Sequence, residues 1–247
     1  MSSLFNFSFF ITQKMKTQLR EGPVHGTLPI LYVFLARTGK TIHEVNFVSL
    51  DEQGKLVADE LVATKRYAAS GVKISFSDGN GPKQTLYYFS TNLADGSFQR
   101  SGFSAFLARL GPADSLIKSA SYLLHNAHFA GVRKLLLNNS ATIVQDDSGI
   151  PLTYFEATTW RVLAFGRYAG PISMFANFYQ PRMAELFQNA GPLEFGIGYR
   201  WRTNESNLLV AQNGSPPNSD ELTAQVQPDT STAEPAAPPP KKDTKAR

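Results

Sequence analysis

Four side chains between residues 118 and 125 combine the chemistry of an active site. Lys118, Ser121, Tyr122 and His125 are spaced three and four residues apart, and on a helix that spacing places side chains on one face. A lysine one turn from a serine hydroxyl can serve as its general base, and a nearby histidine can carry a proton. The spacing therefore predicts a polar helix face suited to hydrolysis or group transfer.

The same residues have an ordinary structural interpretation. Nucleophilic serines usually lie on sharp turns where the hydroxyl is exposed beside backbone donors. A serine in the middle of a helix is more often a small residue that permits close packing. A solvated or capping role for Ser121 therefore remains the alternative to catalysis.

A pair of carboxylates, Asp146 and Asp147, follows the short β-branched run 141–145, which we expect to be a strand. Sites in α/β proteins often form at the carboxyl ends of strands. We therefore expect both aspartates to share one hollow with Lys118 and His125. The alternative is a plain turn over 146–149, whose residue types are typical of turns.

A second candidate site consists of side chains that can grip an anion, because arginine can bind a carboxylate or phosphate through two parallel hydrogen bonds. We expect Arg167, Tyr168 and Arg200 to bind a ligand, with Arg161 and Arg202 as further candidates. Ordinary pairing with surface Asp and Glu is the alternative.

Composition limits the other classes of site. The net charge of +4 is spread along the 247 residues, and nucleic-acid binding usually needs a concentrated basic face. The absence of cysteine excludes disulfides, a thiol nucleophile and Cys-ligated zinc. Of the four histidines, only His125 and His128 are close in sequence, and a zinc site would need both of them together with a carboxylate. We therefore expect no nucleic-acid partner, no metal and no cofactor.

Hydrophobic periodicity predicts the elements that position these side chains. Helices are expected over 4–19, 27–37, 103–110, 116–126, 129–137 and 171–190, the last with a kink or break at Pro181. Strands are expected over 42–50, 72–76, 84–90, 141–145, 152–156, 193–201 and 207–211. This order predicts an α+β fold, a mixed sheet with antiparallel hairpins and helices packed over it.

The chain divides into a single globular domain over 1–211 and a tail over 212–247. The tail is rich in Pro, Ser, Thr and Ala, so it buries too little apolar area to offset its ordering entropy. We expect it to be disordered. Its Pro238–Lys242 run could serve as a polyproline segment.

Three runs resemble a family of bacterial hypothetical proteins over about residues 27–211. They are SLIKSASYLLH, QDDSGIPLTYF and PLEFGIGYR. Members of that family carry an additional Rossmann-like N-terminal portion, and many are exported. The resemblance implies that an upstream portion is missing here, and it adds a truncated α/β Rossmann-like domain as the alternative fold. It implies no role for any residue.

The N-terminal run does not have the pattern of a secretory signal, since Lys14 and Lys16 follow the apolar stretch instead of preceding it. It is also shorter than a membrane span. As it stands, the chain is expected to be cytoplasmic; a periplasmic or exported location is the alternative if a signal segment is missing upstream.

Two functions remain open at this point. The first is a domain that binds a small molecule or an anion. The second is a hydrolase- or transferase-type enzyme with its site around Lys118, Ser121, His125, Asp146 and Asp147.

Overall fold

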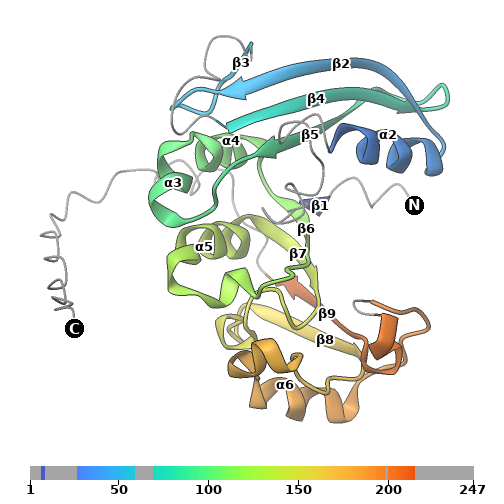
Figure 1. The fold of residues 1–247 in the computed structure, drawn as a ribbon, viewed down its shortest axis with the longest axis vertical. Coiled ribbons are helices and arrows are strands. Elements are labelled where there is room, and N and C mark those ends of the chain that lie inside the picture. Colours follow the sequence, from blue (N-terminus) through green and yellow to red (C-terminus); the bar gives the residue numbers. More distant parts are fainter. Residues whose placement is uncertain (1–6, 9–26, 59–68, 198–199, 215–247) are drawn as a thin grey trace, which may run out of the picture.

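The computed structural model of the chain describes residues 7–8, 27–58, 69–197 and 200–214. They form an α+β fold with two sheets, one antiparallel and one mixed, and helices packed on both (Figure 1). The predicted fold class is confirmed. The mixed sheet contains one parallel strand–helix–strand unit. Its other strand pairs at that side are antiparallel, unlike those of a Rossmann-like sheet.

The four-stranded sheet is antiparallel throughout and curves over one helix (Figure 1). In sheet order its strands are β3 (Leu56–Ala58), β2 (Lys40–Leu50), β4 (Ala69–Asp78) and β5 (Gln84–Ser90). The helix is α2 (Leu28–Arg37), whose Leu31 and Leu35 belong to the same buried cluster as Val72 and Ile74 of β4. The alternation of apolar and polar residues in β4 produces this buried face.

The five-stranded sheet is mixed. In sheet order its strands are β1 (Phe7–Ser8), β6 (Ala113–Ile117), β7 (Ser140–Gln145), β9 (Asn207–Asn213) and β8 (Trp160–Gly166). The β1, β6 and β7 strands are parallel, and β9 runs antiparallel to both of its neighbours. The helix α5 (Ala130–Asn139) provides the crossover from β6 to β7.

Strand register brings three strand ends to one edge of this sheet. Ile117 at the end of β6 is level with Gln145 at the end of β7. Gly166 at the end of β8 is level with Asn207, where β9 begins, and Gln145 in turn pairs with Leu209 of β9. The segments that follow β6, β7 and β8 therefore emerge at the same edge, beside the start of β9.

The remaining helices are short. They are α3 (Asp95–Arg100), α4 (Phe103–Leu110) and α6 (Pro181–Leu186), together with 3₁₀ turns at Leu123–His125, Ala127–Phe129, Leu152–Tyr154, Ser173–Phe178, Phe187–Asn189 and Arg200–Glu205. Among the described residues every helix is too short or too polar to cross a lipid bilayer.

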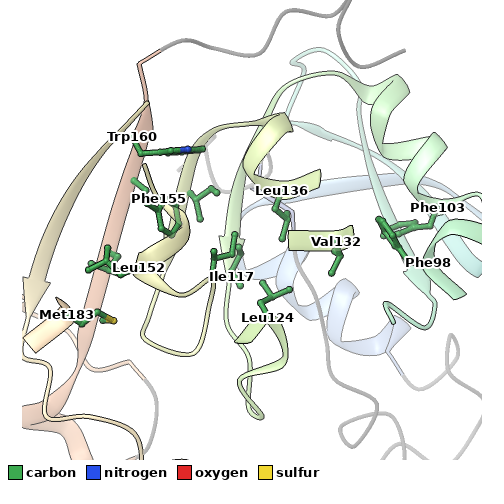
Figure 2. Close-up of a cluster of buried hydrophobic side chains, with 14 of the residues drawn as sticks. Phe98, Phe103, Ile117, Leu124, Val132, Leu136, Leu152, Phe155, Trp160 and Met183 are labelled. Atoms are coloured by element: carbon green, nitrogen blue, oxygen red, sulfur yellow. The ribbon is translucent and has the colours of Figure 1, made fainter. Parts of the chain in front are cut away.

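One apolar cluster joins the two sheets and supports the strand ends. It extends from Phe98 and Phe103, through Val132 and Leu136 of α5, to Ile117 of β6 (Figure 2). Each fully buried aliphatic side chain of this kind stabilises the fold by about 1.5–3 kcal/mol. The edge at which β6 and β7 end therefore rests on a packed core.

The helix predicted over 116–126 is wrong. Leu116 and Ile117 close strand β6, and only Leu123–His125 forms a single 3₁₀ turn. Tyr122 has φ 50° and ψ 42°, a left-handed conformation that a continuous right-handed helix cannot contain. The hydroxyl of Ser119 accepts the N–H of Leu123 at 3.0 Å, so the side chain competes with helical bonding.

The strand predicted over 193–201 is also wrong. Residues 192–197 are irregular, Arg200–Glu205 is a 3₁₀ segment, and residues 198–199 lie outside the described part. Gly191 pairs with β8, donating to the carbonyl of Ala164 at 2.9 Å. The next residue is Pro192, which has no N–H to extend a ladder. Strand β8 itself was not predicted.

Two smaller expectations need correction, and a third is confirmed. The strand expected over 152–156 is the 3₁₀ turn Leu152–Tyr154, and the N–H of Leu152 donates to the side chain of Gln180 at 2.8 Å instead of to a neighbouring strand. The break expected at Pro181 within 171–190 is confirmed, since the 3₁₀ segment Ser173–Phe178 ends before it and α6 begins at Pro181, where proline is favoured. In the helix expected over 4–19, Phe7–Ser8 is strand β1, and the other residues lie outside the described part.

The other predicted elements are confirmed to within a few residues, namely α2, β2, β4, β5, α4, α5, β7 and β9. Residues 215–247, which include nearly all of the predicted tail, lie outside the described residues.

Candidate functional site

A pocket lies at the edge where β6, β7 and β8 end. Its lining includes Lys118 after β6, Asp146 and Asp147 after β7, Asn207 at the start of β9, and Arg202. It encloses an empty volume of about 480 Å³, part of which is open to solvent. Ligand sites in open α/β sheets commonly occupy this position relative to the strands.

Lys118 and Asp146 form an ion pair across the two parallel strand ends. The lysine side chain is 44% exposed and the aspartate side chain 6%, so the ammonium group faces solvent with the carboxylate behind it. The other carboxylate oxygen accepts the N–H of Ser148 at 3.0 Å and also its hydroxyl. Burial raises the pKa of Asp146, and it outweighs the opposing effects of Lys118 and Ser148.

Asp147 is held by two side chains from other segments. Its Oδ2 accepts the hydroxyl of Tyr122 at 2.6 Å, and its Oδ1 accepts Nδ2 of Asn207 at 3.1 Å. The backbone N–H of Asp147 donates to Oδ1 of Asn207 at 2.7 Å. Burial, and then the hydrogen bond to Asp147, raise the pKa of Tyr122. The tyrosine therefore acts as a hydrogen-bond donor that fixes the carboxylate.

The backbone carbonyl of Asp147 is contacted by two further side chains. It accepts Nε2 of His125 at 3.2 Å and Nε2 of Gln180 at 3.3 Å. Because a carbonyl oxygen only accepts, the ring proton of neutral His125 must be on Nε2. Burial lowers the pKa of His125, and the bond to the Asp147 carbonyl opposes that effect. His125 therefore holds the turn from behind the pocket.

The turn that carries both aspartates is closed by Gln145. Its side chain donates to the carbonyl of Ile150 at 2.6 Å and accepts the N–H of Ile150 at 2.8 Å. A Cβ on Gly149 would lie against the Gln145 side chain, closer than van der Waals contact. Glycine is therefore required at that position, and the 146–149 turn predicted from residue types is confirmed.

The two strand-end loops are also joined to each other. The N–H of Ser119 donates to the hydroxyl of Ser148 at 2.9 Å. Tyr122, in the first loop, is the one non-glycine residue with positive φ among the described residues, which costs about 1–2 kcal/mol. Backbone strain of this kind concentrates at functional sites. The strain lies on the residue that binds Asp147.

Arg202 also lines the pocket. Its Nε pairs with Glu205, and its Nη2 donates to the carbonyl of Gly170 at 2.9 Å. Gly170 has φ 96°, and a Cβ there would lie 3.0 Å from the ring of Tyr179. Only glycine allows the ring to approach the backbone so closely.

The structure brings together three of the five residues predicted to be catalytic. Lys118, Asp146 and Asp147 line the pocket, and His125 contacts Asp147 from behind. Ser121 is exposed and lies outside the pocket lining, and its N–H donates to the Ser119 hydroxyl at 3.4 Å. The expected shared helix face does not exist, because the chain turns at Ser121.

The predicted anion-binding residues separate. Arg167 is exposed, and its backbone N–H bonds the carbonyl of Ser206 at 2.8 Å. Tyr168 is buried, its hydroxyl accepts the N–H of Gln180 at 2.9 Å, and burial raises its pKa to about 12. The side chain of Arg200 lies outside the described part. Arg202, the further candidate, lines the pocket.

Sequence reasoning missed the polar residues that support the site, chiefly Asn207, Ser148 and Gln180. Asn207 begins strand β9, which was predicted. Its polar side chain at the start of a strand was the signal that could have indicated a place in the site. Gln180 lies in a segment predicted to be helical, and nothing in its pattern indicated a contact with the 146–149 turn.

Comparison with protein-family models, with curated proteins and with solved structures finds no match for this chain. The resemblance to a bacterial family therefore stays a prediction. Within the described residues, no group of three or more His, Asp or Glu side chains is arranged to hold a metal ion.

Proposed function

We propose that the strand-end pocket binds a small polar molecule that carries both hydrogen-bond donors and acceptors. The observation that supports this is the pairing of charges within the lining. Lys118 forms one bond, to the carboxylate of Asp146. Arg202 forms two, to the carboxylate of Glu205 and to the carbonyl of Gly170. An ammonium group has three donors and a guanidinium group five, so, counting bonds among the described residues, both cations retain N–H groups for a ligand.

The carboxylates supply the matching acceptors. Each oxygen of Asp147 accepts one side-chain donor, and a carboxylate oxygen has two lone pairs. The three carboxylates of Asp146, Asp147 and Glu205 outnumber the two cations in the lining. A strongly anionic ligand would meet that excess of negative charge, so a neutral or zwitterionic ligand suits the pocket better than the anion expected from the arginines.

Binding without hydrolysis is the better-supported function. A serine hydrolase needs a reactive hydroxyl in the pocket, and Ser121 lies outside the lining. Ser148 lines the pocket but is buried, with its hydroxyl donating to Asp146 and accepting from Ser119. Ser119 also lines the pocket and is buried, and its hydroxyl oxygen accepts the N–H groups of Ser121 and Leu123. The hydroxyls of Ser119 and Ser148 therefore hold the two loops in place.

A thermal-shift screen tests the proposal. The probes are neutral saccharides and polyols, zwitterionic amino acids, dicarboxylates and inorganic phosphate, each titrated against the full chain. A ligand that binds only the native state raises the melting temperature as its concentration rises above Kd. We expect shifts from the neutral or zwitterionic probes, and smaller shifts from dicarboxylates and phosphate.

Two variants make the screen specific to the pocket. Lys118→Met removes an ammonium group that lines it, and Lys134→Met removes an exposed lysine of α5 outside it. Each variant is compared with its own melting temperature without probe. The ligand-induced shift should fall for Lys118→Met and persist for Lys134→Met. Equal shifts in both variants, or no shift with any probe, would contradict the proposal.

A further inference from the structure

An aromatic ring stands at the border of the pocket. Tyr179 is 50% exposed, and its ring stacks on that of Tyr168 with centroids 5.7 Å apart and an interplanar angle of 23°. Gly170 lines the pocket, and the Tyr179 ring packs so closely on it that a Cβ at Gly170 would lie 3.0 Å from the ring. Tyr179 therefore packs against a residue that lines the pocket, and half of its own surface is exposed.

The ring is held in place by the same contacts that organise the site. The hydroxyl of Tyr168 accepts the N–H of Gln180 at 2.9 Å, which anchors the residue that follows Tyr179. The carbonyl of Gly170 accepts Nη2 of Arg202 at 2.9 Å. The ring of Tyr179 and the guanidinium group of Arg202 therefore both contact Gly170. Trp201, the neighbour of Arg202, is 75% exposed and adds a second large aromatic side chain to this segment.

We propose that the ligand of the pocket is a saccharide whose ring packs on Tyr179. This inference rests on the proposed binding function and specifies its ligand class. A pyranose has an apolar C–H face and an edge of hydroxyl groups that both donate and accept. The C–H face matches an exposed aromatic ring, and the hydroxyl edge matches the mixed donors and acceptors of Lys118, Arg202 and Asp147.

Other ligand classes fit this surface less well. Aromatic rings beside carboxylates can bind a quaternary ammonium group through cation–π attraction, but such a group has no acceptor for the N–H groups of Lys118 and Arg202 in the same lining. A zwitterion such as glycine betaine satisfies the charges and offers no hydroxyl edge for the remaining donors and acceptors. A saccharide uses both the ring and the polar groups.

Saturation-transfer NMR on the full chain tests the inference at millimolar ligand. The probes are glucose, galactose, N-acetylglucosamine and their β-linked disaccharides, with glycine betaine, glutamate and inorganic phosphate as the other classes. We expect transfer to the ring C–H protons of at least one saccharide. Replacing Tyr179 by Ala or Leu should weaken that saccharide about threefold to tenfold. Tyr179→Phe, which keeps the ring, should retain binding within about twofold.

Controls separate this inference from the proposed function. Tyr179→Leu keeps apolar bulk against Tyr168, so it reports on the ring even if Tyr179→Ala unfolds. Tyr32→Ala removes an exposed tyrosine of α2 and should leave saccharide binding unchanged. Binding of betaine or glutamate that depends on Lys118, without saccharide binding, would overturn the inference and leave the pocket function intact, whereas binding of phosphate alone would contradict both. Saccharide binding that is unchanged in Tyr179→Leu would overturn it too, and no binding by any probe would refute both.

Discussion

The hydroxyl of Tyr122 donates to Oδ2 of Asp147 over 2.6 Å, although the tyrosine follows β6 and the aspartate follows β7. The bond connects two loops that leave adjacent parallel strands at one sheet edge. Asn207, at the start of β9, binds the same carboxylate. Three segments distant in sequence are therefore joined at one side chain.

Tyr122→Phe tests how much this bond contributes. The change leaves the ring stacked on Phe178 and removes one donor from the buried Asp147 carboxylate. We expect the free energy of unfolding to fall by about 1–3 kcal/mol, the range for hydrogen bonds to charged groups and for leaving one buried group unsatisfied. Urea denaturation measures it, with Tyr154→Phe at an exposed position as the control. Equal stability of the two variants would contradict the role assigned to Tyr122.

The Lys118–Asp146 pair should respond differently to loss of each partner. Lys118→Met leaves a buried carboxylate without its cation, so we expect a loss of about 2–3 kcal/mol. Asp146→Asn leaves a half-exposed ammonium group that water can solvate, and we expect about 1 kcal/mol. Denaturant titration of both variants compares the two losses. A larger loss for Asp146→Asn would show that the carboxylate is not the desolvated partner.

His125 should make stability pH-dependent below neutrality. Its pKa in the folded chain is lowered, so the unfolded chain binds the proton more tightly. The stabilisation is complete above the unfolded pKa of about 6.5 and is lost as pH falls from there through the folded pKa. His125→Gln keeps a side-chain donor and should flatten this part of the profile. His128→Gln, at an exposed position, should not, and a profile unchanged by His125→Gln would refute the assignment.

Gly149→Ala should weaken the turn that carries the aspartates. The added Cβ meets the Gln145 side chain, which is buried and already bonded twice to Ile150. We expect a loss of about 1–3 kcal/mol, typical of overpacking a well-packed region. Gly196→Ala is the matched control, because a Cβ there meets no atom of the described residues within 4 Å. Thermal unfolding that is equally affected by both changes would contradict the account of the turn.

Much of the fold could be predicted because local patterns agreed with it. The alternation in β4 and the turn residues 78–82 are enough to predict a hairpin from local sequence, and the β-branched run of β7 indicates a buried strand. The Asp146–Asp147 pair was expected at the end of that strand, where the structure places it.

The errors share a physical origin in non-local contacts. The 116–126 segment has helical spacing, but its first residues pair with β7 and its turn is stabilised by hydrogen bonds from Ser119 and Tyr122 to distant partners. The 193–201 segment alternates as a strand does, but Pro192 ends its pairing with β8. A single sequence does not show which strands lie next to each other in a sheet. It therefore could not predict that Asn207 and Gln180 contact Asp147.

The most direct test of the central claim is chemical-shift mapping on the isotope-labelled full chain during titration with a mixture of neutral saccharides and zwitterionic amino acids. The account predicts that the backbone amides of Ser119, Asp147 and Asn207 shift together in a saturable manner, while those of β2 and β4 stay fixed. Shifts confined to the four-stranded sheet, or no shift at millimolar ligand, would contradict a binding pocket at the ends of β6, β7 and β8.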